Sequence, residues 1–114
     1  MKLVHQEIQY IEFLSPDLER IKTFYQAAFD WKFTDYGDQY TAFSGENVDG
    51  GFAVGEPVAG SILVVLYSSN IEDSLARMVE AGGTLTQDIF EFPGGRRFQF
   101  VDPDGNELAV WTDY

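Results

Sequence analysis

Two glutamates, Glu12 and Glu107, are the side chains of this sequence best placed to do chemistry together. Glu107 lies in FVDPDGNELAV, residues 100–110, just after a turn, and Glu12 lies in IQYIEFL, residues 8–14. Paired carboxylates in a pocket can act as general acid and base, or can bind a hard cation such as Mg²⁺ or Ca²⁺. They can equally be charges at a solvated rim. The strands that carry the two glutamates decide whether they meet.

Other chemically active groups are scarce. His5 is the only histidine, and the absence of cysteine excludes disulfides, thiolate metal sites and cysteine nucleophiles. We expect His5 to be a surface residue of the N-terminal segment, which argues against a Ser-His-Asp triad. The glycine pairs follow a helix or open a strand. They therefore do not form a phosphate-binding loop or a dinucleotide fingerprint, in which glycines lead into a helix.

The composition is that of an acidic globular domain. Of the 114 residues, 45% are hydrophobic and 16% aromatic, so we expect one folded domain with one core. Nineteen acidic and seven basic side chains give a formal net charge of -12, which repels nucleic acid and anionic lipid and favours cationic ligands. No apolar run suits a signal peptide or a membrane span, so we expect a cytoplasmic protein with no nucleic-acid or membrane partner.

The first half of the chain predicts a strand, a helix and three further strands. Residues 8–14 alternate like a strand, and Ser15 and Pro16 predict the N-cap and first position of a helix through residue 29. One apolar face of this helix recurs at the helical spacing: Leu18, Ile21, Phe24, Tyr25, Ala28 and Phe29. Turn residues separate three strand candidates, at 31–36, 39–44 and 50–55.

The second half repeats this order after a Gly/Pro linker at 56–60. Residues 61–68 predict an apolar strand, and Asn70 is the expected N-cap of a helix that ends at Gly82-Gly83. The apolar face of this helix comprises Ile71, Leu75, Met78 and Val79. Three more strands are predicted, at 84–92, 96–101 and 106–111. Residues 1–114 therefore form a single domain of two βαβββ modules, module one at about 6–55 and module two at about 61–112.

The run Asp102-Pro103-Asp104-Gly105 is explained by turn chemistry alone. Pro103 fixes φ at the second position of the turn, and Asp102 can accept hydrogen bonds from backbone N–H groups just after it. Gly105 supplies a left-handed conformation that closes the hairpin. This run therefore needs no catalytic role.

Five motifs, taken in order, resemble the vicinal oxygen chelate superfamily, which includes glyoxalases, extradiol dioxygenases and the bleomycin and fosfomycin resistance proteins. The motifs are Asp17-Leu18-Glu19-Arg20 with Phe24-Tyr25, Phe29-Asp30-Trp31-Lys32-Phe33, Gly50-Gly51-Phe52, Ala81-Gly82-Gly83, and Asp102-Pro103-Asp104-Gly105-Asn106. The resemblance extends from Ile8 to Trp111. It implies an α+β fold in which tandem βαβββ modules form a cupped eight-stranded mixed sheet, the glyoxalase/bleomycin resistance/dioxygenase fold.

The resemblance also implies where a metal ion would be held, and this sequence lacks the usual ligands there. Counting from the motifs places the family's His and Glu ligands at Tyr10, Leu63 and Ala109, and the fourth at Phe52 or Val54. A divalent ion needs several converging lone pairs, which these positions do not supply. We therefore expect no metal and no other cofactor.

Strand alternation predicts the residues that line the cup instead. They are Tyr10, Glu12, Phe43, Phe52, Leu63, Val65, Tyr67, Glu107, Ala109 and Trp111. Aromatic walls with a few acids suit a flat, apolar or cationic small molecule, although the same aromatics could belong to the core or to a dimer interface. Arg96 and Arg97 are adjacent on one strand and point to opposite faces, so we expect them to be solvated.

Two functions of different classes remain open. The first is a metal-free small-molecule-binding protein, resembling bleomycin resistance proteins, that sequesters an aromatic or cationic compound in a cupped groove. The second is a glyoxalase-like lyase, isomerase or dioxygenase that uses Glu12 and Glu107 in a carboxylate-only metal site or in acid–base chemistry. The missing ligands favour binding. By resemblance we also expect a homodimer whose grooves are shared by the two subunits, because one helix per module leaves a sheet face uncovered.

Overall fold

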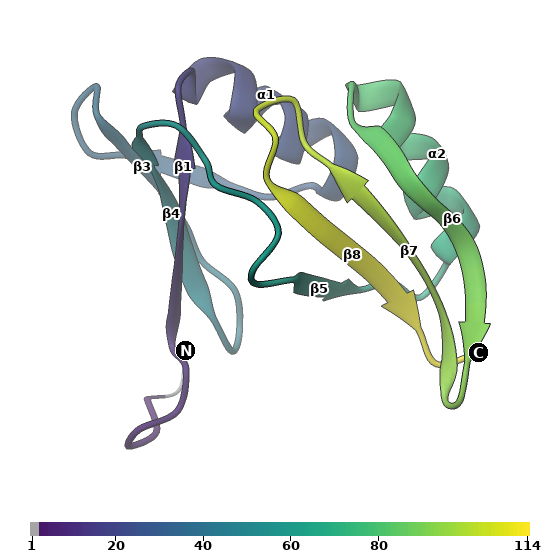
Figure 1. Cartoon of the computed structure of the whole chain (residues 1–114). Helices are drawn as coiled ribbons and strands as arrows, with labels where there is room; N and C mark the ends of the chain where they lie inside the picture. The colour runs from purple at the N-terminus through teal and green to yellow at the C-terminus, as the bar shows by residue number, and fades with distance from the viewer. Residues whose placement is uncertain (1–2) are drawn as a thin grey trace.

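The computed structural model describes residues 3–114 and has the element order βαβββ twice (Figure 1). Module one contains β1 (Tyr10–Ser15), α1 (Leu18–Phe29), β2 (Phe33–Asp35), β3 (Tyr40–Phe43) and β4 (Asp49–Val54). Module two contains β5 (Val64–Tyr67), α2 (Ile71–Ala81), β6 (Thr84–Phe92), β7 (Gly95–Val101) and β8 (Glu107–Thr112). This element order confirms the predicted α+β class.

The eight strands of the predicted fold are arranged as two four-stranded mixed sheets, one in each module. The strand orders are β1-β4-β3-β2 and β5-β8-β7-β6. In each sheet the first strand of the module pairs in parallel with the last, and the other pairings are antiparallel. This pairing makes β1 and β5 edge strands. In the described residues no ladder joins them.

Strands β1, β2, β3 and β5 are each shorter than predicted. Strand β2 begins at Phe33 and not at Trp31, because the Trp31 backbone N–H donates to the Tyr25 carbonyl at the end of α1, at 3.3 Å. Strand β5 begins at Val64, because the exposed residues 61 and 62 continue the linker that was predicted to end at residue 60. Within residues 3–114, neither helix is long and apolar enough to cross a membrane.

The helix caps are set by short polar side chains. The N-cap of α1 is Asp17, whose carboxylate accepts from the Arg20 backbone N–H at 3.1 Å, and the expectation for Ser15 was wrong. Ser15 still pairs with Val54 at the end of β1, and its hydroxyl accepts from the Asp17 N–H at 3.0 Å. The predicted caps of α2 are confirmed: Asn70 accepts from the Asp73 N–H at 3.1 Å, and Gly82 is the C-cap.

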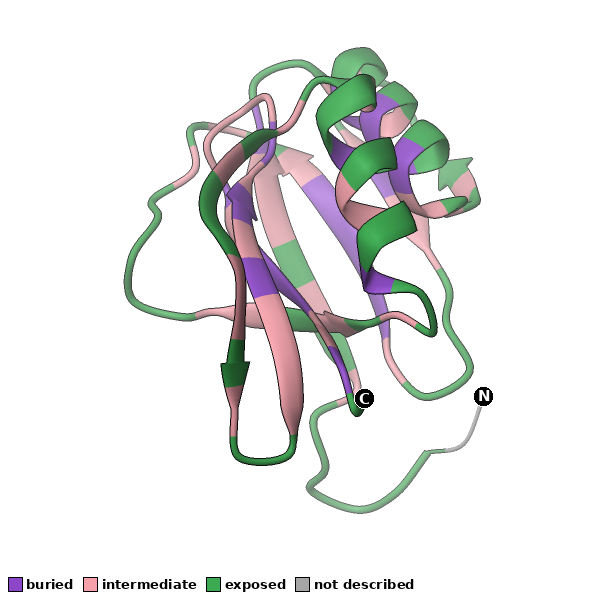
Figure 2. Cartoon of the chain, turned by 90° about the vertical axis from the view of Figure 1, so that its right-hand side faces the viewer, coloured by how far each residue is buried: buried purple, intermediate pink, exposed green. Residues whose placement is uncertain are grey.

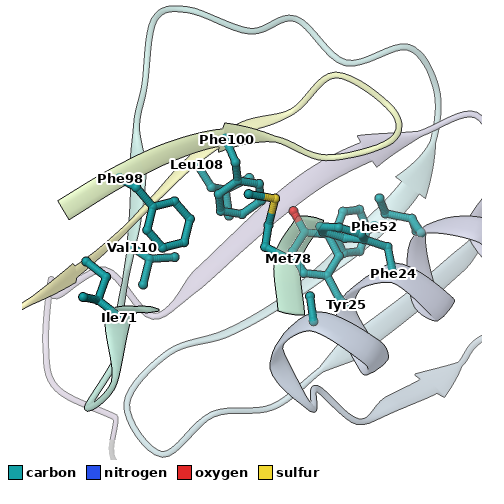
Figure 3. Close-up of a cluster of buried hydrophobic side chains, with 11 residues drawn as sticks. Phe24, Tyr25, Phe52, Ile71, Met78, Phe98, Phe100, Leu108 and Val110 are labelled. Atoms are coloured by element: carbon teal, nitrogen blue, oxygen red, sulfur yellow. The ribbon is translucent and has the colours of Figure 1, made fainter. Parts of the chain in front are cut away.

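Both modules contribute to one hydrophobic core, which lies between the helices and the sheets (Figure 3). Its most buried members are Ile21, Phe24, Tyr25, Ala28, Phe52, Ile71, Met78, Phe98, Phe100, Leu108 and Val110. Figure 2 shows the two helices together on one side of the strands. The prediction for Val79 was wrong: it is exposed, because the face of α2 that packs inward is centred on Ile71 and Met78.

The turn after β7 ties the two modules together. The buried Asp102 carboxylate accepts from the Tyr25 hydroxyl of α1 at 2.9 Å and from the backbone N–H groups of Asp104 and Asn106 at 2.9 and 3.0 Å. The Asn106 side chain also donates to the Leu14 carbonyl of β1 at 3.0 Å. Gly105 has the left-handed conformation predicted for this turn, with φ 101°. The Asp102-Pro103-Asp104-Gly105 turn that precedes Glu107 is thus a structural connection between the two modules.

Candidate functional site

A chain of two phenols and a carboxylate lies on the face of the first sheet opposite the core residue Phe52. The hydroxyl oxygens of Tyr10 and Tyr40 are 2.5 Å apart, and the Tyr40 hydroxyl donates to Glu12 Oε1 at 2.9 Å. Tyr10 and Glu12 are two residues apart on β1, so alternation puts them on one face. Gly51 of the intervening β4 permits the approach, because a Cβ there would lie 2.5 Å from the Tyr40 hydroxyl and 2.7 Å from that of Tyr10.

The two hydrogen bonds that join Tyr10, Tyr40 and Glu12 run in one direction, with each proton donated toward Glu12. Burial, together with the bonds to Tyr10 and Glu12, raises the pKa of Tyr40 well above its usual value, so its hydroxyl stays protonated. Because that proton is donated to Glu12, the Tyr40 oxygen accepts from Tyr10. The groups left for a ligand are lone pairs on the Tyr10 oxygen and on the second oxygen of Glu12, which are acceptors. The row of Tyr10, Tyr40 and Glu12 therefore suits a ligand that donates hydrogen bonds, above all a cationic ligand.

Glu12 and Glu107 border the same cavity, of about 300 Å³. One wall is β1, another is the linker, and the start of β8 closes the end. The lining residues are Ile11, Glu12, Phe13, Leu14, Pro57, Val58, Ala59, Ser61, Ile62, Val64, Asn106 and Glu107. The structure thus brings the two glutamates to one space between the modules, with Glu12 held by Tyr40.

A second cavity, of about 380 Å³, adjoins the first and is mainly apolar. The two cavities share Ile11, Phe13 and Val64, the side chains that flank the facing edges of β1 and β5. Two predicted ligand-binding residues, Phe43 and Val65, line it together with Trp31 and Leu66. An acidic compartment and an aromatic compartment therefore lie side by side between the modules.

The other predicted residues are placed differently. Phe52 and Ala109 are fully buried, and Phe52 stacks on Phe13 with ring centroids 5.1 Å apart, so its side chain belongs to the core. Leu63 precedes β5 and is half-buried. Tyr10 is 43% exposed and Tyr67 is 56% exposed, which leaves both rings accessible on their sheets.

Trp111, the remaining predicted ligand-binding residue, lies on the second sheet. It is half-buried and packs edge-on against Tyr67, with ring centroids 5.5 Å apart. Register explains the contact, because Tyr67 of β5 pairs with Trp111 of β8. These two rings therefore form one aromatic surface on the second sheet, whereas Tyr10 and Glu12 belong to the first.

Sequence reasoning missed Tyr40 and the linker. Tyr40 is 28 residues from Glu12 in the chain, and only the register of β3 on β4 and of β4 on β1 brings it there. A tyrosine at an alternating position of a predicted strand was the only available signal. Pro57 and Ile62 lay in or beside a stretch taken as a connection between modules, yet they form a cavity wall.

The residues present do not fit the metal site of metal-dependent relatives. Tyr10 is committed to a hydrogen bond with Tyr40, and Ala109 offers a buried methyl group. Across residues 3–114, no group of three or more His, Asp or Glu side chains is arranged to hold a metal ion. His5 is exposed and precedes β1. Metal independence itself stays a prediction.

The sequence matches the family model of the Glyoxalase/Bleomycin resistance protein/Dioxygenase superfamily over residues 7–110. The match spans both modules and includes the two edge strands that flank the cavities. This chain belongs to that superfamily. The resemblance inferred from the sequence motifs is thereby confirmed. No curated protein sequence matches the chain significantly.

Several solved structures share the fold of this protein at low sequence identity. A glyoxalase/bleomycin resistance protein/dioxygenase family enzyme from Burkholderia phytofirmans PsJN superposes with TM-score 0.83 at 14% identity, covering 93% of this chain and 98% of that one. A glyoxalase-related enzyme from Fulvimarina pelagi gives TM-score 0.81 at 21% identity, covering 94% and 88%. TioX from Micromonospora sp. ML1 gives 0.75 at 16% identity, covering 95% and 99%. At these identities the similarity shows the fold alone.

Proposed function

We propose that this superfamily member is a metal-free binding protein for a small aromatic or cationic compound, acting in the manner of the resistance proteins of its superfamily. The observation that carries the proposal is that Glu12, which accepts from Tyr40 in the hydrogen-bonded row Tyr10–Tyr40–Glu12, lines the same cavity as Glu107. The adjoining aromatic cavity supplies apolar area for a ring. Each cavity lies within the roughly 300–1,000 Å³ range of small-molecule sites.

Charge supports a cationic group on the ligand. Two carboxylates border the first cavity, and among residues 3–114 no lysine or arginine lines it. The formal net charge of -12 adds a long-range attraction for cations. Tyrosine rings beside a carboxylate are also a favourable setting for an ammonium group, because cation–π attraction adds to charge pairing.

The proposal includes a cytoplasmic homodimer. Tyr10 and Tyr67 stay exposed on sheet faces that neither α1 nor α2 covers, and a second copy would shield such faces. Light scattering at micromolar concentration is expected to give twice the monomer mass. A monomeric mass at that concentration would contradict the shared groove.

The binding test uses three naphthalene probes of equal size: 2-naphthylmethylammonium, 2-naphthalenemethanol and 2-naphthoate. Calorimetry is expected to show the ammonium probe binding roughly tenfold more tightly than the alcohol, which corresponds to one partly desolvated charge pair. Glu12→Gln should remove that difference. The matched control is Glu80→Gln, an exposed glutamate on α2, which should change the affinity less than about twofold. Equal binding of ammonium and alcohol would overturn the proposal for cations.

A second candidate function is acid–base catalysis by the same two glutamates. It is favoured by one observation, that Glu12 and Glu107 border a single cavity. An enzyme of this kind would exchange the proton next to a carbonyl, so 1-acetonaphthone in deuterated water is a suitable probe. Deuterium incorporation followed by NMR, lost in both Glu12→Gln and Glu107→Gln, would replace the binding function with an isomerase-type activity.

A further inference from the structure

A row of aromatic rings with one arginine crosses the face of the second sheet opposite the core. The register pairs Tyr67 with Trp111, Trp111 with Arg97, and Arg97 with Phe90, so all four side chains share one face. Ring contacts agree with this placement: Tyr67 lies 5.5 Å from Trp111, and Phe92 lies 6.4 Å from Trp111, between centroids. Phe98 and Phe100, which alternate with Arg97 on β7, point the other way into the core (Figure 3).

Arg97 is poorly satisfied in this position. Its only hydrogen bond in the described structure runs from Nη2 to Gln99 Oε1 at 3.2 Å, and its buried Nε has no partner. The guanidinium stands over the Phe90 ring, 5.3 Å from the centroid. A buried N–H group without an acceptor is unfavourable, because it has lost its water without a replacement hydrogen bond.

The neighbouring arginine shows the contrast. Arg96 points to the opposite face, where Nη1 pairs with Glu72 at 2.6 Å and Nε donates to the Tyr114 carbonyl at 2.9 Å. The chain has nineteen acidic residues, yet in residues 3–114 none forms an ion pair with Arg97. The nearby Asp113 carboxylate accepts from the Tyr67 hydroxyl at 2.9 Å instead. The two arginines point to opposite faces as expected, but the expectation that both are merely solvated was wrong: Arg96 is ion-paired with Glu72, and Arg97 has a buried Nε without a partner.

We infer that this aromatic face is a binding site for a planar aromatic carboxylate, with the guanidinium of Arg97 pairing with the carboxylate. The inference rests on the proposed binding of a small aromatic compound, but it assigns to this second face a ligand of opposite charge to the one proposed for the cavity of Glu12 and Glu107. A guanidinium presents a planar fork of N–H donors that matches a carboxylate, and its charge strengthens each hydrogen bond. The rings of Trp111, Phe92 and Tyr67 offer half-exposed or exposed surfaces for stacking beside it.

Charge along β8 orients such a ligand. Glu107 lies on the same face as Trp111 but four residues away, which is about 13 Å along a strand. The carboxylate of a ligand is therefore drawn to the Arg97 end and repelled from the Glu107 end. Because the net charge of the whole chain disfavours anions at long range, selectivity for an acid must come from the local guanidinium.

The test is calorimetry of the full chain with 2-naphthoate, compared with 2-naphthalenemethanol and 2-naphthylmethylammonium at equal ionic strength. We expect 2-naphthoate to bind at least tenfold more tightly than the alcohol. Arg97→Gln should remove that advantage, whereas Arg96→Gln, the neighbour on the opposite face, should change it less than about twofold. Arg97→Lys keeps the charge without the fork and should retain only part of the advantage.

Several results would overturn the inference. Equal affinity for acid and alcohol would do so, and so would equal losses in Arg97→Gln and Arg96→Gln. If Arg97→Gln fails to fold by circular dichroism, Arg97→Lys and the probe comparison on the unaltered protein still decide. Binding of the ammonium probe alone, dependent on Glu12, would refute this site and leave the proposed cation binding intact. Binding of 2-naphthoate alone, dependent on Arg97, would support this site and refute the proposed cation binding. If no probe bound, both the Arg97 site and the cation binding would be rejected.

Discussion

Replacing Tyr25 by phenylalanine removes one atom from the connection between the modules and should have a large effect on stability. The Tyr25 hydroxyl is the donor from α1 to the Asp102 carboxylate in module two, at 2.9 Å, and both residues are buried. In the variant, Asp102 Oδ2 keeps a single donor, the Asn106 side-chain amide at 3.0 Å. No water can replace the lost hydroxyl without entering the core.

The size of the effect follows from the charge on the acceptor. A hydrogen bond to a charged group contributes about 1.5–3 kcal/mol, and the cavity left by one oxygen adds little. For a domain of 114 residues this corresponds to a fall in Tm of roughly 6–12 °C. The matched control is Tyr36→Phe at an exposed tyrosine, where a change within about 0.5 kcal/mol is expected.

The pH dependence gives an independent check. Burial raises the pKa of Asp102, and the hydrogen bond from Tyr25 opposes that rise. An acid whose folded pKa is raised stabilises the fold more as pH falls, because the folded state takes up the proton first. In Tyr25→Phe the folded pKa rises further, so the loss of stability should be largest near neutral pH and shrink as the carboxyl becomes protonated.

Urea denaturation followed by far-UV circular dichroism measures both effects. The midpoint should fall with an unchanged m-value, because the variant exposes the same surface on unfolding. A loss below about 0.5 kcal/mol, or a loss that is equal at about pH 7 and about pH 4, would refute the view that a charged Asp102 holds the modules together through Tyr25.

Three further outcomes are expected. Gly51→Ala should lower the free energy of unfolding by about 1–3 kcal/mol and weaken binding of the ammonium probe in calorimetry. The reason is that the new Cβ would clash with the hydroxyls of Tyr10 and Tyr40 and with the Thr41 carbonyl, 2.8 Å away. Unchanged stability and binding would contradict this close approach. Asn70→Ala should cost about 1 kcal/mol in urea denaturation through loss of the α2 N-cap, whereas Asn70→Gly should cost only a few tenths. Raising the pH above about 10 should lower the free energy of unfolding, because the unfolded chain ionises Tyr25 and Tyr40 first. Tyr40→Phe should weaken this pH dependence, and an unchanged slope would contradict the raised pKa.

Local chemistry made much of the fold predictable. Asn70 and Gly82 bound α2 as expected, since a capping side chain and a terminal glycine act over a few residues. The turn at Asp102 was predictable for the same reason. Ser15 shows the limit of this reasoning, because pairing with Val54 extends β1 through the residue that was expected to cap α1. Ser15 could either cap α1 or end β1, and its pairing in the sheet places it at the end of β1.

The site was predictable only in part. Alternation placed Tyr10 and Glu12 on one face, and Val65 and Tyr67 on another, because the period of a strand is local. It could not tell that Phe52 would be fully buried, since burial depends on what packs against a face. This difference separates the predicted residues that are open to a ligand from those that serve the core.

The sequence by itself determined the two βαβββ modules, the helix faces, the acidic charge and the absence of the usual metal ligands, because each depends on residue type or short-range spacing. The tertiary structure alone decided that Tyr40 meets Glu12, that Glu107 borders the same cavity and that Arg97 forms no ion pair with an acid within residues 3–114. These three facts depend on strand register and on the packing of one module against the other. Such contacts join residues far apart in the chain, and no local pattern encodes them.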